Sequence, residues 1–399
     1  MNLLSFSSSR FLRSNSTVLG RCSTRTFTVF PPPIIPGTKL TGYEQSVGNT
    51  RLLRLKCASE ATGCDIYGKC EWENPGGSVK DRAALWMIKD AEKRGKLQAG
   101  KRGIIVEGTA GNTGIGLALA GISRGYDVVI CLANTQSQEK KNALEQAGAV
   151  LVEVPAVPYK NPNNYVHVAE RMASEILASG EYGSNVFYAN QWDNLSNRQS
   201  HIDGTGPEIW EQLGGNIDAF SCATGTGGTL TGVGEYLRSQ SPEVKVVLTD
   251  PEGGAIVRYF TEGKLRAVGS SISQGIGQGR ITGNMRAGNF RPDMCFEVSD
   301  MEMLPVLQLL QQEEGICVGG SAGINVAGAI KVAEYLGPGH TIVTVLCDKS
   351  ERYASQLYNA RFLNSVGLPA PTWIVENERK QKRFQKICEE SLENVNEPT

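Results

Sequence analysis

The stretch IDAFSCATGTGGTLTGVGEYLRS, residues 217–239, joins a continuously apolar run to a helical pattern through a turn of small residues. Residues 217–222 have the length and composition of a strand that is covered on both faces. The turn Gly225-Thr226-Gly227-Gly228-Thr229 follows, and a helix is predicted over residues 229–239. A buried strand that enters a helix through glycines is typical of an α/β fold with a parallel sheet.

The same alternation extends outward from this unit in both directions. Strands are predicted at residues 65–72, 103–107, 127–132, 150–154, 217–222, 244–249 and 341–347. Helices are predicted at residues 78–93, 112–124, 137–147, 229–239, 300–313 and 321–336. This β–α order implies mostly parallel, twisted sheets with right-handed crossovers and helices on their faces.

The glycine turn at residues 225–229 also predicts an anion site. Residues without side chains let several backbone N–H groups converge at a helix N-terminus, where a phosphate is stabilised, and the two threonines add hydroxyl donors. A plain structural turn is one alternative. A dinucleotide site is another, because Asp250 ends the next strand, but the G-x-G-x-x-G pattern requires glycine where Leu230 stands.

A single lysine stands in the first turn of the helix predicted at residues 78–93. The segment NPGGSVKDR spans residues 74–82, and Ser78 followed by Asp81 forms a capping-box pattern at its helix start. Lys80 then lies against the positive end of the helix dipole, where a cation is misplaced, so a neutral nucleophilic amine is favoured. On the residues alone, an ordinary exposed lysine remains the alternative.

Two further glycine turns enter predicted helices. GTAGNTG, residues 108–114, follows the strand that ends at Glu107 and is suited to holding a carboxylate at a helix N-terminus. A capping turn around Asn112 is its structural alternative. GGSAG, residues 319–323, opens the helix at residues 321–336, with Ser321 in the position of an N-cap.

Together these motifs resemble the cysteine synthase family of fold-type II pyridoxal-phosphate enzymes, which includes cystathionine β-synthase, over about residues 48–358. The resemblance implies a two-domain, tryptophan synthase β-like fold, in which each domain has a mostly parallel twisted sheet with flanking helices. It implies a catalytic region at residues 39–360, with a smaller domain at about 81–189 and a larger domain at about 44–80 plus 190–360. It also implies a homodimer, and some members bind serine acetyltransferase.

The resemblance assigns roles to individual residues, with pyridoxal 5'-phosphate as the cofactor. Lys80 would form the internal aldimine, Asn112 would bond the ring hydroxyl, and Ser321 would face the pyridine nitrogen. The phosphate would be held by Gly225, Thr226, Gly227, Gly228 and Thr229. The substrate would be bound by Thr109, Gly111, Asn112, Thr113, Gln191 and, in a loop like the family's Gly-Ile-Gly loop, Gly275.

The implied activity is that of a transferase that makes L-cysteine from O-acetyl-L-serine and sulfide through an aminoacrylate intermediate, with the Lys80 amine as general base. Two departures from the family leave the donor open. Ala110 stands where many cysteine synthases have serine, and Arg280 adds a cation beside the Gly-Ile-Gly loop. Arg280 would favour O-phosphoserine if it paired with the phosphate. The alternative is an arginine turned to solvent or to Asp293.

Three rival functions remain. Cystathionine β-synthase-type condensation of serine with homocysteine uses the same core, although the residues after Tyr358 are too few for the regulatory module of that enzyme's long forms. Serine or threonine dehydratases lack the NPGGSVKDR pattern. A catalytically quiet scaffold that kept the fold is the non-enzymatic alternative, and intact Lys80 and Asn112 argue against it.

Composition excludes several other classes. The 399 residues carry a net charge of −1, so no global field attracts nucleic acid or anionic lipid. No apolar run reaches the roughly 18 residues of a membrane-spanning helix. The ten cysteines contain no CxxC pair and the three histidines no i, i+4 pair, so neither a metal site nor a disulfide framework is predicted.

The two ends of the chain differ in composition from its middle. Residues 1–38 are rich in arginine and serine, contain no acid, and end in a proline-rich spacer. This pattern predicts a mitochondrial transit peptide, with a disordered cytosolic tail as the alternative. Residues 361–399 form a C-terminal extension with an apolar helical stripe, whose basic start and acidic end oppose the helix dipole. A frayed, solvated tail is therefore expected there, rather than a partner-binding helix.

Overall fold

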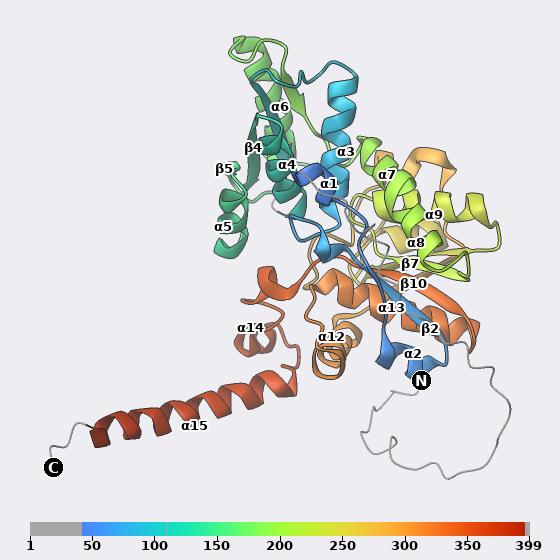
Figure 1. The fold of residues 1–399 in the computed structure, drawn as a ribbon, viewed down its shortest axis with the longest axis vertical. Helices are drawn as coiled ribbons and strands as arrows, with labels where there is room; N and C mark the ends of the chain where they lie inside the picture. Colours follow the sequence, from blue (N-terminus) through green and yellow to red (C-terminus); the bar gives the residue numbers. More distant parts are fainter. Residues whose placement is uncertain (1–41, 110, 396–399) are drawn as a thin grey trace.

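The computed structural model describes residues 42–109 and 111–395 (Figure 1). The predicted transit peptide and spacer, residues 1–38, lie outside the described residues, as does Ala110. Strands and helices alternate through this part of the chain, as predicted. The strands are β1 Leu52–Arg54, β2 Asp65–Cys70, β3 Gly103–Gly108, β4 Tyr126–Ala133, β5 Val150–Val154, β6 Val186–Tyr188, β7 Ala219–Cys222, β8 Lys245–Pro251, β9 Met294–Val298 and β10 Thr341–Leu346.

Within the described residues, the strands form two sheets. One has six strands in the order β1-β2-β10-β7-β8-β9, and the other has four in the order β5-β4-β3-β6. β1 pairs antiparallel with β2, and every other pairing between these named strands is parallel. In the larger sheet Val343 of β10 lies between Tyr67 of β2 and Phe220 of β7. The predicted α/β fold with mostly parallel sheets is therefore confirmed.

Helices flank both sheets (Figure 1). The α-helices are α1 Gly42–Ser46, α2 Lys56–Thr62, α3 Lys80–Lys93, α4 Asn112–Ser123, α5 Gln138–Gln146, α6 Tyr165–Ser179, α7 Ser196–Ser200, α8 Gly206–Gln212, α9 Gly228–Gln240, α10 Ile256–Glu262, α11 Gly283–Arg286, α12 Asp300–Glu314, α13 Gly320–Leu336, α14 Ala360–Ser365 and α15 Thr372–Val395. A π-helical segment, His201–Thr205, connects α7 to α8.

Apolar cores on both faces of each sheet explain why most predicted strands are continuous hydrophobic runs in the sequence. In the smaller sheet, α3 and α4 pack on one face and α6 on the other. In the larger sheet, α2, α12 and α13 cover one face and α8, α9 and α10 the other. β3, β7 and β10 are buried along their whole length, as expected for parallel strands between two helical layers.

The C-terminal extension differs from its prediction. A frayed tail was expected beyond residue 361, whereas Thr372–Val395 forms one continuous helix, α15, that extends away from the rest of the molecule (Figure 1). Its sequence is rich in Glu, Lys, Arg and Gln, which have high intrinsic helix propensity. This propensity outweighs the unfavourable dipole, so that part of the prediction is wrong. Phe384 and Ile387 are 59% and 49% exposed, so the helix is solvated as expected.

Candidate active site

One cavity of about 500 Å³ gathers the turns that follow strands of both sheets. Segments beyond the carboxyl ends of β2, β3, β7 and β10 all line it, which is where α/β sheets bind ligands. The structure brings every predicted site residue except Gly228 to this wall, namely Lys80, Thr109, Gly111, Asn112, Thr113, Gln191, Gly225, Thr226, Gly227, Thr229, Gly275 and Ser321. Gly228 begins α9 behind the wall, where a Cβ atom would lie 2.3 Å from Asn197 Oδ1.

A buried carboxylate holds the loop that carries Lys80. Asp81 accepts hydrogen bonds from the backbone N–H groups of Gly76 at 2.7 Å and Ser78 at 3.2 Å. Ser78 Oγ in turn accepts from the N–H of Lys80 at 3.2 Å. Only half of the predicted capping box is present, because Asp81 accepts from the Ser78 N–H while the N-cap of α3 is Val79, and α3 begins at Lys80, two residues later than predicted. Lys80 Nζ makes no hydrogen bond or ion pair with the described part of the chain, so its amine is available to a ligand.

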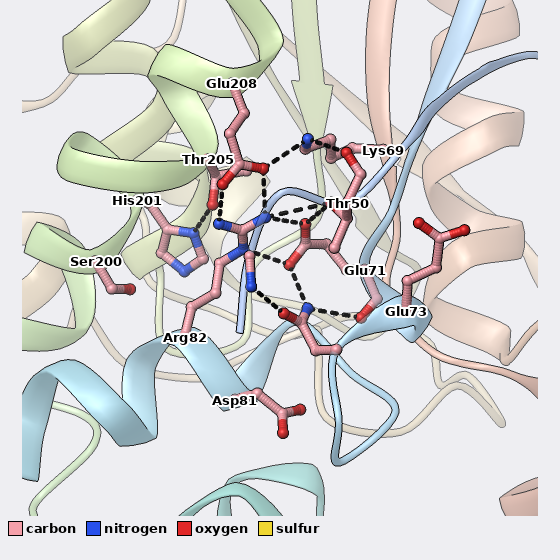
Figure 2. A network of polar contacts seen from close by, with 12 residues as sticks. Thr50, Lys69, Glu71, Glu73, Asp81, Arg82, Ser200, His201, Thr205 and Glu208 are labelled. Atoms are coloured by element: carbon pink, nitrogen blue, oxygen red, sulfur yellow. Dashed lines mark hydrogen bonds and ion pairs between the residues drawn. The ribbon is translucent and has the colours of Figure 1, made fainter. Parts of the chain in front are cut away.

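Behind Lys80, a buried charge network anchors α3 to the larger sheet (Figure 2). The Arg82 guanidinium bonds both oxygens of Glu71, at 2.7 and 2.8 Å, and both oxygens of Glu208, at 2.7 Å each. Lys69 Nζ lies 2.7 Å from Glu208 Oε2. Burial alone would raise the pKa of Glu208, but Arg82 and Lys69 hold that pKa at about 2. Two cations and two carboxylates thus neutralise one another in the interior.

The glycine turn between β7 and α9 forms a cradle of backbone donors. Gly227 has a φ of +84°, and a Cβ on Gly225 would lie 2.3 Å from the carbonyl oxygen of Gly275, so only glycine fits either position. Asp250 fixes the start of the turn, since it accepts from Thr224 N at 2.7 Å. The N–H groups of Gly225, Thr226 and Gly227 donate to no acceptor in the described chain. The cradle therefore fits a phosphate, and Asp250 serves the turn rather than a ribose.

A neutral histidine supports the cradle from behind. His201 Nε2 lies 3.2 Å from Thr229 Oγ1, and its Nδ1 lies 2.8 Å from Thr205 Oγ1 (Figure 2 shows the second contact). Burial, together with the nearby charges of Arg82 and Lys80, holds the pKa of His201 well below its ordinary value. The π-helical segment that carries His201 is a rare conformation that is often found at functional sites.

The loop after β3 is tied to Gln191 by a buried hydrogen-bond chain. Thr113 Oγ1 donates to Gln191 Oε1 at 2.6 Å, and Gln191 Nε2 donates to Glu107 Oε1 at 3.3 Å. Asn190 has a positive φ of 47°, and the next residue, Gln191, also donates its backbone N–H to Glu107 Oε2 at 3.3 Å. This arrangement fixes the Gln191 amide at the cavity wall, where Thr113 and Gln191 can both bond a carboxylate ligand.

Sequence reasoning missed two residues on the other side of Asn112. Asn112 Nδ2 donates to Asp348 Oδ2 at 2.7 Å, and its Oδ1 accepts from Arg352, which also donates to the carbonyl oxygen of Gly76. Both residues follow β10 and lie far from Asn112 in sequence. Both belong to the segment DKSERY, residues 348–353, which resembles imperfectly the family's second serine-rich turn near the pyridine ring, and that resemblance assigned neither residue a role.

Arg280 was predicted either to pair with a phosphate leaving group or to turn to solvent or to Asp293, and the structure shows a different arrangement. Its guanidinium carbon lies 4.5 Å from the ring centroid of Tyr159 and 4.8 Å from that of Trp192, a cation–π sandwich. Asp293 bonds Arg238 at 2.7 Å instead. Arg280 is not among the residues that line the cavity. The hypothesis that it pairs with a phosphate leaving group therefore gains no support from its position.

The pKa of Glu107 provides a prediction for stability. Burial raises this pKa from 4.5 to about 8, so the folded protein holds a proton that the unfolded chain releases. Stability contributed by this proton is complete below pH 4.5 and is lost as pH rises through 8. A Glu107→Gln variant keeps a neutral side chain of the same shape. Relative to the variant, the free energy of unfolding of the wild type should fall by up to about 1.4 kcal/mol for each pH unit between the unfolded and folded pKa values of Glu107, as measured by urea unfolding. An unchanged difference across pH would contradict the raised pKa.

Two other properties of the described residues bear on the class of protein. No group of histidine, cysteine and acidic side chains between residues 42 and 395, Ala110 excepted, is arranged to hold a metal ion. In the same part of the chain, no helix combines the length and the apolar character needed to cross a bilayer.

Comparisons with known proteins cover most of the residues that line the cavity. A family model described as "Pyridoxal-phosphate dependent enzyme" matches residues 43–348. "Cysteine synthase 1" of Neurospora crassa is 48% identical over 330 residues, which is 82% of this chain and 85% of that protein. A relative from Saccharomyces cerevisiae, provisionally named as a mitochondrial cysteine synthase, is 37% identical over 344 residues, 83% of this chain and 87% of its own. The crystal structure of O-ureido-L-serine synthase has a TM-score of 0.71 at 32% identity and covers 80% of this chain and 95% of that one.

Proposed function

The chain belongs to the family of pyridoxal-phosphate-dependent enzymes, and on that premise we propose that it makes L-cysteine from O-acetyl-L-serine and sulfide. The observation that carries this proposal is that one cavity wall holds a lysine amine and a glycine cradle whose N–H groups, like that amine, have no partner among the described residues, in a chain 48% identical to a cysteine synthase. In the reaction, the Cβ–O bond of O-acetylserine breaks and a Cβ–S bond forms. Hydrosulfide is consumed and acetate is released, so atoms and charge balance.

The residues of the cavity fit pyridoxal 5'-phosphate. The unpaired N–H groups of Gly225, Thr226 and Gly227, with the start of α9, would hold its phosphate, and Thr229 would add a hydroxyl. Lys80 would hold its aldehyde carbon, and Asn112 and Ser321 would contact its ring. When bound, the cofactor supplies an electron sink that makes loss of the substrate's α-proton feasible.

This chain's own residues would perform the remaining work. Thr109, Gly111, Thr113 and Gln191 would bind the substrate carboxylate and set the orientation of Cα. Lys80 Nζ would take the proton from Cα and return it, which leaves no net proton on the enzyme. Ser321 would offer a neutral hydrogen bond at the ring nitrogen, where an aspartate would hold a proton. The ring would then withdraw electrons less strongly, which favours loss of the β-substituent of the substrate.

The two sheets are the basis for the proposed domain division. β3, β4, β5 and β6 all lie within residues 103–188, so we place the smaller domain at about residues 81–189. The larger domain would then comprise about residues 44–80 and 190–360. Closure of the smaller domain over the substrate carboxylate would exclude water from the cavity.

Assembly and location are further parts of the proposal. We propose a homodimer, as the family resemblance implies, and serine acetyltransferase as a possible partner for the enzyme in cysteine supply. We also propose the mitochondrion as its compartment. The acid-free, Arg- and Ser-rich composition of residues 1–38 and the name of the yeast relative support that location.

One assay of donors and acceptors tests the function. Purified protein is supplied with O-acetylserine or O-phosphoserine plus sulfide, and separately with serine plus homocysteine. The proposal expects cysteine with O-acetylserine as the better donor. Cystathionine formation without cysteine formation would replace the proposal with the cystathionine β-synthase reaction. Absence of turnover in every combination would favour the alternative of a catalytically quiet scaffold.

The Gln191 amide gives a prediction for substrate affinity. A Gln191→Ala variant loses one donor to the substrate carboxylate and leaves Thr113 and Glu107 without their shared partner. We expect the KM for O-acetylserine to rise by about tenfold or more, because a hydrogen bond to a charged group contributes about 1.5–3 kcal/mol. Steady-state kinetics measures this effect. Gln199→Ala, on an exposed bond to Asp203, is the matched control and should leave KM unchanged.

A further inference from the structure

A second lysine of the described chain lines the active-site cavity without a direct ion pair. Lys140 lies in the first turn of α5, and the lining also includes Thr135, Gln136 and Ser137 from the segment before this helix. Its Nζ donates to two neutral amide oxygens, Gln274 Oε1 and, at 3.5 Å, Gln136 Oε1. In the described part of the chain, it forms no ion pair with an acidic side chain.

The other cations of the cavity already have partners. Lys80 is the proposed cofactor attachment, and Arg352 donates to Asn112 and to the carbonyl oxygen of Gly76. None of the described residues that line the cavity is acidic. Lys140 therefore contributes a positive charge that no described residue of the cavity lining pairs with; burial lowers its pKa, and the nearby charges of Asp348 and Glu139 offset that effect only in part. A partly buried cation of this kind is stabilised by an anionic ligand.

The proposed reaction exchanges one small monoanion for another. Acetate would leave the β-carbon and hydrosulfide would arrive there, while neutral donors on other parts of the wall would hold the cofactor phosphate and the substrate carboxylate. A lysine ammonium is a compact point charge, which can pair with hydrosulfide, an anion without a planar face, as well as with the carboxylate of acetate.

We propose that Lys140, held by Gln136 and Gln274, is the anion-binding residue of this cavity and binds both the departing acetate and the incoming hydrosulfide. This inference rests on the proposed function for the identity of the anions. It assigns specificity to a residue that contacts neither the cofactor cradle nor the loop that would bind the substrate carboxylate.

The neighbouring lysine provides a matched control. Lys141 Nζ pairs with Glu153 Oε2 at 2.7 Å and donates to the carbonyl oxygen of Asn134 at 3.1 Å. Lys141 carries the same charge as Lys140 and is the next residue along α5. Unlike Lys140, it forms an ion pair and does not line the cavity. Any effect of Lys140 that comes only from net charge on α5 should also appear in a Lys141 variant.

The experiment measures anion binding and turnover on the holoenzyme. Sodium acetate is titrated at constant ionic strength, and its dissociation constant is read from the broadening of the acetate methyl resonance. Lys140→Gln should weaken acetate binding and raise the KM for sulfide, each by about tenfold, because a charge-assisted hydrogen bond is lost. The KM for O-acetylserine should change less than about threefold, Lys140→Arg should recover most of the loss, and Lys141→Gln should match the wild type.

Two results would overturn the inference. These are unchanged acetate binding in Lys140→Gln and an equal loss in Lys141→Gln. An equal fall in cofactor content or melting temperature would show a structural role instead. If the wild type makes no cysteine, the proposed function fails, while the acetate titration still decides whether Lys140 binds anions.

Discussion

A Lys80→Ala variant is expected to lose cysteine synthesis by at least about a thousandfold, because it removes the amine that we propose as the general base for the proton on the substrate Cα. It should also lose the covalent attachment of the cofactor. Lys80 is placed for both roles by the Asp81 carboxylate, which fixes the loop before α3, and by the absence of any bond from its Nζ to the described chain. Steady-state kinetics and the visible absorption of the purified protein measure the two losses.

The matched control for Lys80 lies on the same helix. Lys89 pairs with Glu44 at 2.6 Å, and its side chain is 46% exposed. Lys89→Ala should keep full activity and the same absorption spectrum, because an exposed ion pair contributes about 0–1 kcal/mol. Activity within tenfold of the wild type in Lys80→Ala would show that another group removes the α-proton.

An Arg82→Met variant is expected to lose about 3–5 kcal/mol in free energy of unfolding, because it leaves two buried carboxylates without their cation. The guanidinium is the centre of the network in Figure 2, where it bonds both oxygens of Glu71 and both of Glu208. Because Arg82 lies two residues beyond Lys80 in α3, the variant should also bind the cofactor more weakly. Urea unfolding of the apoprotein measures stability, and equilibrium dialysis measures affinity for the cofactor.

The pH dependence of the Arg82 variant follows from Glu208. In the wild type its pKa is lowered from 4.5 to about 2, so its contribution to stability is complete above pH 4.5 and is lost as pH falls toward 2. Without Arg82 that contribution is reduced, so the deficit of the variant should be largest at neutral pH and shrink in acid. A deficit independent of pH would contradict this account of the network.

Two further variants check the size of the Arg82 effect. Arg94→Met removes an exposed pair with Asp90 on the same helix and should cost no more than about 0.5 kcal/mol. Adding Glu208→Gln to Arg82→Met should recover part of the loss, because it removes one uncompensated charge. If Arg94→Met were as destabilising as Arg82→Met, burial of the network would not be the cause.

Much of the fold could be predicted because the buried strands are long and uniformly apolar. Strands such as β3 and β10 are buried on both faces, so their sequences are mostly apolar and easy to recognise. The glycine turns after such strands indicate where helices begin. β1, β6 and β9 were not predicted, since each is a short edge or end strand and none is fully buried. α6 was also not predicted, because no glycine turn precedes its first residue, Tyr165.

The site was predicted where its residues are close in sequence, and missed where they meet only in space. The phosphate cradle and the loop after β3 are short motifs with a local mechanism. By contrast, Asp348 and Arg352 reach Asn112 from beyond the last strand, and Lys140 meets Gln274 across the cavity. His201 resembled an isolated histidine in the sequence, and only the fold brings it to Thr229.

Borohydride reduction of the holoenzyme followed by peptide mapping tests the central claim most directly. Reduction fixes the cofactor on the nitrogen that holds it, and mass spectrometry of the peptides locates the added group. The account predicts the label on Lys80, within the segment NPGGSVKDR. A label on Lys140, on any other lysine, or on none would contradict it.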